Sequence, residues 1–154
     1  MAISARMTGL PGGQAITSIM RDYGIAPGTN PADNFSDAGD TWYSGYLAAA
    51  KRLGISKGIG NSLFAPDKEI TREEMFTLLY SALGAIRQLP SDMANPVRTL
   101  TDFTDAGQID SWAKEAMTLL VETGIVKGNA GKLMPLDTST RAEMAQVLYN
   151  LMTR

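Results

Sequence analysis

The sequence predicts an all-α fold built from helix–loop–helix repeats, and three observations lead to this prediction. The stretches 35–86 and 103–154 carry the same residue types in the same order. Each ends in a segment that opens with Thr-Arg-x-Glu, at residues 71–74 and 140–143. Apolar residues recur at spacings of three and four through both stretches, which is typical of amphipathic helices. We therefore expect negligible strand content.

The two copies match at every landmark of the repeat. The first copy carries Phe35-Ser36-Asp37, Trp42, Gly54-Ile55-Ser56-Lys57-Gly58, Pro66 and Thr71-Arg72-Glu73-Glu74. The second carries Phe103-Thr104-Asp105, Trp112, Gly124-Ile125-Val126-Lys127-Gly128, Pro135 and Thr140-Arg141-Ala142-Glu143. The offset between matching residues changes from 68 at the Phe to 70 at the Trp and 69 at the Arg. The copies therefore differ by small length changes in loops, as in repeat architectures.

The first helix of each copy is expected near residues 42–53 and 111–123. Natural caps bracket both segments, with Asp40 and Asp110 before them and Gly54 and Gly124 after them. Trp42 and Trp112 stand at the start of the apolar stripes. We expect their rings to anchor the core, with one edge left to face a ligand.

The second helix of each copy begins at the Thr-Arg-x-Glu motif, and we call it the motif helix. Thr71 and Glu74, like Thr140 and Glu143, have the spacing of a capping box, in which each side chain accepts from the other residue's amide. The apolar stripes that follow include Leu79 and Leu148. We expect both leucines to be buried.

The arginine inside each motif is not explained by capping. Arg72 and Arg141 lie in the first turn, where the helix dipole already supplies partial positive charge and a cation is disfavoured. A basic side chain beside free helix amides is suited to binding an anion. An ordinary alternative is an ion pair with Asp37 or Asp105. We expect Arg→Ala at either position to leave the fold intact.

The N-terminal third is less regular. Residues 14–23 predict a short amphipathic helix that ends in Gly-Ile-x-x-Gly, at 24–28. We interpret 14–28 as a degenerate first helix. The alternative makes it the end helix of a truncated preceding repeat, with Gly12-Gly13 where Thr-Arg should be. The expected organisation is a part-repeat at 1–34, repeats at 35–89 and 103–154, and a linker at 90–102.

Composition excludes several function classes. The chain has neither cysteine nor histidine, so disulfides, thiolate metal sites and the commonest general base are absent, and we do not expect an enzyme. No calcium-loop spacing occurs, and we expect no metal or cofactor. The net charge of −2 argues against nucleic-acid binding. No apolar run is long enough for a membrane span. Residues 1–13 show no secretory signal.

In combination, these landmarks resemble the S-layer homology (SLH) repeat. The resemblance covers 35–86 and 103–154, and more weakly the part before them. It implies three repeats packed as a spindle, with the first helices forming a central three-helix bundle and the motif helices as prongs. Grooves between prongs are implied to bind secondary cell-wall polysaccharide, often through a pyruvylated, anionic terminal sugar.

The resemblance also implies which residues bind the glycan. Arg72 and Arg141 are the foremost, joined by six others: Asp37, Asp105, Trp42, Trp112, Gly58 and Gly128. The expected partner is cell-wall polysaccharide, at the cell surface if the chain is exported. The alternative is a protein–protein or lattice-assembly module without a glycan ligand, with self-association completing the three-repeat arrangement.

Overall fold

The computed structural model describes residues 9–29, 33–90, 96 and 98–153, and their regular structure is helical. The α-helices are α2 (Gly12–Asp22), α3 (Ser44–Arg52), α4 (Arg72–Ala85), α5 (Lys114–Glu122) and α6 (Arg141–Met152). Three short 3₁₀ helices precede α5, namely η2 (Leu100–Asp102), η3 (Ala106–Gln108) and η4 (Ser111–Ala113). Extended pairing among these residues is limited to isolated bridges. The all-α prediction is confirmed.

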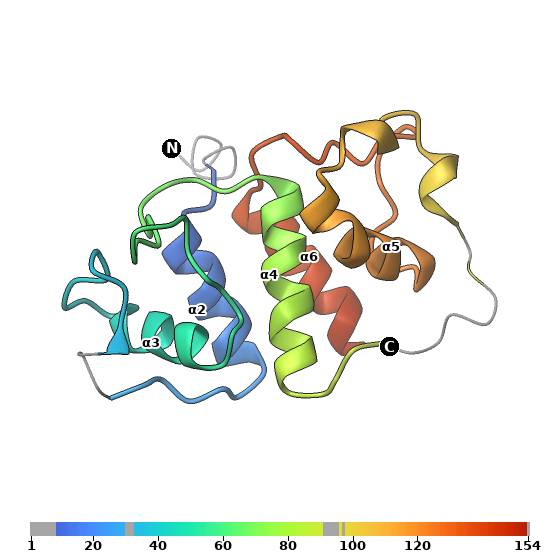
Figure 1. Ribbon diagram of the computed structural model, residues 1–154. Coiled ribbons are helices and arrows are strands. Elements are labelled where there is room, and N and C mark those ends of the chain that lie inside the picture. The colour runs from blue at the N-terminus through green and yellow to red at the C-terminus, as the bar shows by residue number, and fades with distance from the viewer. Residues whose placement is uncertain (1–8, 30–32, 91–95, 97, 154) are drawn as a thin grey trace, which may run out of the picture.

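Helix α4 occupies the centre of the molecule (Figure 1), with α6 behind it, α2 and α3 on one side and α5 on the other. Helix α3 packs on α2, and α5 packs on α4. The expected bundle of 14–23, 42–53 and 111–123 is therefore wrong, because α3 and α5 lie on opposite sides of α4. Each first helix covers the motif helix that comes before it in the chain.

A closed ring of three backbone hydrogen bonds ties the starts of α2, α4 and α6 together. The amide of Leu10 donates to the carbonyl of Ser139 (2.9 Å), Ser139 donates to Ile70 (2.9 Å), and Ile70 donates to Leu10 (3.0 Å). Each of these residues lies two positions before a helix. The three segments are thus related by an approximate three-fold axis.

This ring shows that α2 is a third motif helix. Its N-cap is Pro11, the counterpart of Thr71 and Thr140, and its first residue is Gly12, the counterpart of Arg72 and Arg141. The structure favours the alternative interpretation of the N-terminal third, with Pro11-Gly12 rather than Gly12-Gly13 in place of Thr-Arg. The Gly-Ile ending misled the first interpretation because a left-handed glycine, here Gly24 at φ +67°, ends helices of any kind.

The first amides of two motif helices are already occupied. Gly12 and Gly13 donate to the carbonyls of Lys68 and Pro66, both at 2.9 Å. In α4, Arg72 and Glu73 donate to the carbonyls of Asp137 and Pro135, at 2.9 and 3.0 Å. These bonds lock the loop before one motif helix onto the start of the previous one. They also remove two amides that the sequence had suggested were free for an anion.

The core follows the predicted stripes, but the tryptophans do not. Leu79 and Leu148 are buried as predicted. Trp42 and Trp112 are 61% and 55% exposed, so the prediction that they anchor the core is wrong. The reason is that α3 begins at Ser44 and α5 at Lys114, which leaves both rings ahead of the helices.

The predicted helix caps have mixed outcomes. Gly54 and Gly124 have the expected left-handed φ, +73° and +78°. Asp40 and Asp110 do not cap α3 and α5, whose N-caps are Tyr43 and Ala113.

None of the described helices is both long and apolar enough to cross a membrane.

One face of α6 is uncovered, unlike the same face of the other motif helices. The equivalent positions are buried or half-buried in α2 and α4, where α3 and α5 pack. Within the described residues no first helix packs on α6 in this way. The exposed positions, which we call the α6 stripe, are Ala142, Ala145, Tyr149 and Met152.

Candidate functional site

Three grooves run between neighbouring motif helices. Groove A, between α2 and α4, has a volume of about 310 Å³ and is lined by Gly12, Ile55, Ser56, Gly58, Ile59, Phe64, Ile70, Glu74, Thr77, Leu78 and Trp112. Groove B, between α4 and α6, has a volume of about 390 Å³ and is lined by Arg72, Phe76, Ile125, Val126, Lys127, Gly128, Glu143, Gln146, Val147 and Asn150. Groove C, between α6 and α2, has a volume of about 800 Å³, and the residues used below are Gln14, Arg21, Trp42, Arg141 and Tyr149.

Each groove draws on successive segments of the chain, not on a single repeat. Groove A is the fullest example, with Gly12 from α2, Gly58 from the next loop, Glu74 from α4 and Trp112 from the segment after it. The equivalent set in groove B is Arg72, Gly128 and Glu143, without a tryptophan. In groove C it is Arg141, Gln14 and Trp42, without a loop glycine. The predicted site residues are therefore distributed over three unequal grooves.

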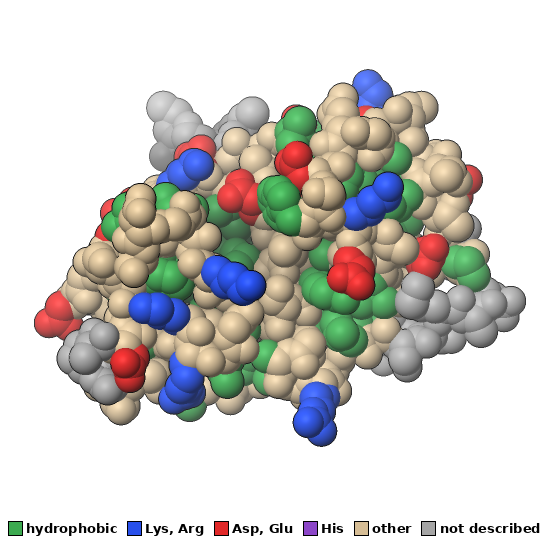
Figure 2. Space-filling model, viewed as in Figure 1, with side chains coloured by type: hydrophobic (Ala, Val, Ile, Leu, Met, Phe, Trp, Pro, Cys, Tyr) green, Lys and Arg blue, Asp and Glu red, His purple; other side chains and the backbone are tan. Residues whose placement is uncertain are grey.

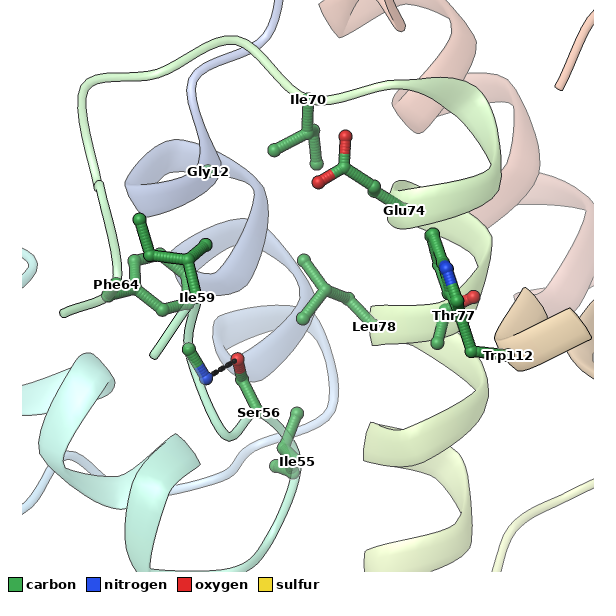
Figure 3. Close-up of a pocket in the computed structure, with 11 residues that line it drawn as sticks. Gly12, Ile55, Ser56, Ile59, Phe64, Ile70, Glu74, Thr77, Leu78 and Trp112 are labelled. Atoms are coloured by element: carbon green, nitrogen blue, oxygen red, sulfur yellow. Dashed lines mark hydrogen bonds between the residues drawn. The ribbon is translucent and has the colours of Figure 1, made fainter. Parts of the chain in front are cut away.

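Groove A is the most apolar of the three in character. Figure 3 shows Phe64 and Ile59 on one wall and Trp112 beside Thr77 on the other, with Leu78 between them. In the space-filling view, hydrophobic side chains lie in a hollow next to α4 at the centre of the molecule (Figure 2). Glu74 is the single charged side chain that lines this groove among the described residues.

Arg72 is held by the protein itself. Its guanidinium Nη1 lies 2.8 Å from the Glu143 carboxylate, its Nε donates to the Leu133 carbonyl at 2.9 Å, and its Cζ lies 5.3 Å from the Phe76 ring centroid. The residue is 9% exposed. These contacts predict that Arg72→Ala costs stability, which the sequence alone did not indicate, while the expectation that the fold stays intact remains a prediction. The partner is also Glu143, and not Asp105 or Asp37.

This ion pair explains why the two capping motifs differ. At α4 the box is complete, because Thr71 accepts from the Glu74 amide and Glu74 accepts from the Thr71 amide. At α6 Thr140 accepts from the Glu143 amide at 3.2 Å, but the Glu143 carboxylate points to Arg72 instead. The predicted box is half formed in the second copy.

Arg141 has a different environment although its motif position is the same. It is exposed and lines groove C with Trp42, Arg21 and Gln14. Among the described residues its side chain makes no ion pair or hydrogen bond. Arg21 was not predicted, because its place in a groove follows only once α2 is aligned with the motif helices.

Asp37 and Asp105 hold the loops that precede the motif helices. The Asp37 carboxylate accepts from the amides of Phe64 and Ala65, at 2.9 and 2.8 Å. Asp105 accepts from Leu133 and Met134, at 2.8 and 2.7 Å.

The same bonds set the charge state of Asp105. Burial by itself would raise the pKa of Asp105, but the amides of Leu133 and Met134 and the nearby Lys132 outweigh it, so the pKa lies below its ordinary value. Neither aspartate lines a groove in the described structure, and their predicted contact with a ligand stays a prediction.

Gly58 and Gly128 are needed by the loops themselves. Both have left-handed φ, +76° and +72°. A Cβ on Gly128 would lie 2.6 Å from the Phe103 ring and 2.7 Å from the Lys132 carbonyl oxygen, and one on Gly58 would overlap the Leu63 carbonyl. They line grooves A and B, so a role in ligand approach remains a prediction alongside this structural one.

Glu73 is a buried carboxyl group that the sequence did not single out. It is 1% exposed, and its Oε1 accepts from the Asp110 amide at 2.9 Å. Burial raises its pKa above the ordinary value of 4.5, the Asp110 amide opposes this, and the carboxylates of Asp110 and Glu74 raise it further. Its contact joins α4 to η4, which carries Trp112.

These features define a class of protein, namely a helical repeat protein whose candidate binding surfaces lie between repeats. No cluster of metal-binding side chains occurs in the described part of the chain. The sequence matches the S-layer homology domain at residues 34–76 and 102–145, which is more than half of the chain. The chain therefore belongs to the S-layer homology family, which consists of non-catalytic anchoring modules of the bacterial cell surface.

Several known bacterial proteins contain a similar segment. The chain is 32% identical over 119 residues to S-layer protein EA1 of Bacillus anthracis, covering 77% of this chain and 13% of that protein. It is 34% identical over 115 residues to S-layer protein sap of the same organism, covering 75% and 13%. It is also 34% identical over 123 residues to exoglucanase XynX of Acetivibrio thermocellus, covering 78% and 11%. The chain thus matches a small fraction of each relative.

Proposed function

We propose that this chain is a cell-wall anchoring module that holds an anionic secondary cell-wall polysaccharide in groove C, with a pyruvylated sugar as the expected terminal unit. The observation that carries this proposal is the contrast between the two motif arginines. The Arg141 side chain is exposed and unpaired among the described residues, whereas the Arg72 guanidinium already forms an ion pair with Glu143. A planar guanidinium can bind a sugar carboxylate through two parallel hydrogen bonds.

Several other lining residues of groove C suit the same ligand, and the two cations Arg21 and Arg141 outnumber the one carboxylate, Asp22, among its described lining residues. Trp42 presents an exposed ring on which a sugar can stack. Arg21 supplies a second cation and Gln14 a neutral amide where the other motif helices carry glutamate. In groove B, the Glu143 carboxylate already occupies the position beside the arginine. Groove B is therefore the weaker candidate for an anion. The function requires the chain to act at the cell surface.

The test is binding of purified wall polysaccharide to the whole chain by calorimetry. Arg141→Ala should weaken binding tenfold or more, and Arg141→Lys should recover part of the loss, because an ammonium cannot form the two-bonded fork. Added salt should weaken wild-type binding. Arg52→Ala, an exposed arginine on α3 outside the grooves, is the matched control. Equal binding by all variants, or no binding at all, contradicts the proposal.

A second candidate, favoured by the α6 stripe, is self-association. In an antiparallel pair of α6 helices, Ala142 of one copy would face Met152 of the other, and Ala145 would face Tyr149. Small residues would then oppose large ones, which would make the α6 stripe complementary to itself, and an isologous two-fold interface requires such self-complementarity. Arg141 would approach the C-terminal end of the partner's α6, where the helix dipole favours a cation.

Sedimentation at increasing concentration tests this candidate. The wild type should form a dimer, and Tyr149→Lys should abolish it. Leu136 is 52% exposed but lies in the loop before α6, so Leu136→Lys should leave the dimer intact. A wild type that stays monomeric, or equal effects of the two substitutions, rules the α6 dimer out.

A further inference from the structure

We infer that groove A is a second glycan site of different specificity, which takes an uncharged sugar unit of the wall polysaccharide. This inference rests on the proposed function, because it assigns a neutral part of the same polymer to a groove other than the one that holds its carboxylate. The starting observation is that groove A has the tryptophan of the groove pattern but has Gly12 in place of the arginine.

The charge of groove A is unsuited to an anion. Its one charged lining residue among those described is Glu74, whose Oε1 accepts from the Thr71 amide at 2.9 Å. In the described structure, the Oε2 of Glu74 makes no hydrogen bond. A carboxylate ligand would meet this like charge in a partly enclosed apolar groove, where repulsion is poorly screened. Sugar hydroxyl groups, which donate hydrogen bonds, are complementary to the same oxygen.

Two other polar side chains that suit a neutral sugar line the same groove, with Ser56 at the end away from Glu74 (Figure 3). The Thr77 hydroxyl donates to the Glu73 carbonyl at 2.7 Å, so its oxygen is left to accept. The Ser56 oxygen accepts from the Gly58 amide at 3.1 Å, so its hydrogen is left to donate. Groove A therefore offers two acceptors and one donor. No cation is required to satisfy the ligand.

The apolar surface has the form of a sugar platform. Trp112 and Ile59 are 55% and 62% exposed and both line the groove. Their exposure carries a hydration cost that a covering ligand would remove. One face of a pyranose ring carries mainly C–H groups, which pack on an indole face. The groove volume of about 310 Å³ lies at the low end of ligand pockets, roughly 300–1,000 Å³, which suits a short glycan segment.

The two tryptophans allow each groove to be observed separately, since they are the chain's whole complement. Trp42→Phe leaves Trp112 as the fluorophore of groove A, and Trp112→Phe leaves Trp42 as that of groove C. The probes are purified wall polysaccharide and the same polymer after carbodiimide–borohydride reduction of its carboxylates to alcohols. Fluorescence titration then gives an apparent affinity for each groove.

We expect the Trp112 titration to give the same affinity for both polymers, within about twofold. The Trp42 titration should give an affinity for the reduced polymer that is at least tenfold weaker than for the intact one. If the reduced polymer does not perturb Trp112, the inference about groove A is overturned while groove C stands. If intact polymer perturbs neither tryptophan, the proposed function itself fails. If Trp112 prefers the charged polymer, groove A is an anion site and the inference is again wrong.

Removing the charge of Glu74 gives an independent check, because it should weaken binding at a neutral-sugar site and strengthen binding at an anion site. Glu74→Gln keeps an acceptor for the Thr71 amide but removes the charge. In the Trp42→Phe background it should weaken the Trp112 response to reduced polymer severalfold, because a carboxylate accepts hydroxyl bonds more strongly than an amide does. Glu69→Gln, an exposed position outside the groove, should have no effect. Tighter binding by Glu74→Gln would overturn the inference.

Discussion

At the scale of single residues, the two motif arginines show how far neighbours determine the role of a side chain. Arg72 is buried between Glu143, Leu133 and Phe76, whereas Arg141 is exposed. The helix dipole disfavours a cation at both positions. At Arg72 a carboxylate 2.8 Å away and a carbonyl acceptor outweigh that effect. Position in the motif alone does not predict function.

Arg72→Ala should lower the free energy of unfolding by about 2–3 kcal/mol. This is less than the roughly 3–5 kcal/mol for a fully buried pair, because the Glu143 side chain is 34% exposed. Arg141→Ala should change stability by no more than about 0.5 kcal/mol. Urea unfolding of both variants measures the difference. Equal destabilisation would show that the Arg72 pair is not maintained in solution.

Glu73→Gln should stabilise the protein at pH 7. A carboxyl group whose pKa is raised by folding binds its proton more tightly in the folded state, so it costs stability as pH rises above its unfolded value of about 4.5. Glutamine removes that cost and keeps an acceptor for the Asp110 amide. The advantage over wild type should shrink towards pH 4, in thermal unfolding across this range. Glu69→Gln is the exposed control, and a pH-independent gain would contradict the assignment.

At the scale of elements, the end of α4 carries a local strain that can be relieved. Arg87 follows the C-cap Ile86 with φ +58°, and the Gln88 amide returns to the Leu83 carbonyl at 2.8 Å. This is the geometry in which helices prefer glycine. In α3 and α5 the same place is taken by Gly54 and Gly124.

Arg87→Gly should therefore raise the free energy of unfolding by about 0.5–1 kcal/mol, because a side chain in the left-handed region costs roughly 1–2 kcal/mol and glycine loses part of that gain as chain entropy. Arg87→Ala keeps the strain and removes the charge, so it separates the two contributions. Stabilisation by alanine as large as by glycine would mean that charge, and not backbone strain, is responsible.

The sequence was most informative about individual elements. Periodicity and capping signals placed the motif helices and the burial of Leu79 and Leu148, because both depend on local spacing. The predicted burial of Trp42 and Trp112 was wrong, because the apolar stripes were drawn from residues that lie before α3 and α5 begin. Local signals also could not show that Glu143 turns towards Arg72, since these two residues are 71 positions apart in the chain.

At the scale of the whole molecule, the approximate three-fold ring organises both fold and grooves. Sequence comparison between two copies cannot show which helices pack together, and the family expectation of a central bundle of first helices was wrong here. The role of α2 was hidden because it lacks the Thr-Arg-x-Glu residues. It became clear only from backbone bonds that join Leu10, Ile70 and Ser139.

The amides of Leu10, Ile70 and Ser139 should exchange with solvent at similar, slow rates. Each donates to the next member of the ring, so exposing one requires separating two of the three motif helices. Hydrogen exchange followed by NMR measures all three in one experiment. Exchange of Leu10 that is orders of magnitude faster than that of Ile70 would show that α2 is not a full member of the ring.

The central claim is that Arg141 and Trp42, which lie 99 positions apart, act on one ligand in one groove. The most direct measurement is a double-mutant cycle for binding of intact wall polysaccharide, by calorimetry on the whole chain. Arg141→Ala and Trp42→Ala should be coupled by about 1 kcal/mol, within the range of roughly 0.5–3 kcal/mol for residues that share a partner. Arg141→Ala and Trp112→Ala should be additive to within about 0.5 kcal/mol. Additive effects of Arg141 and Trp42, or strong coupling of Arg141 to Trp112, would contradict this account.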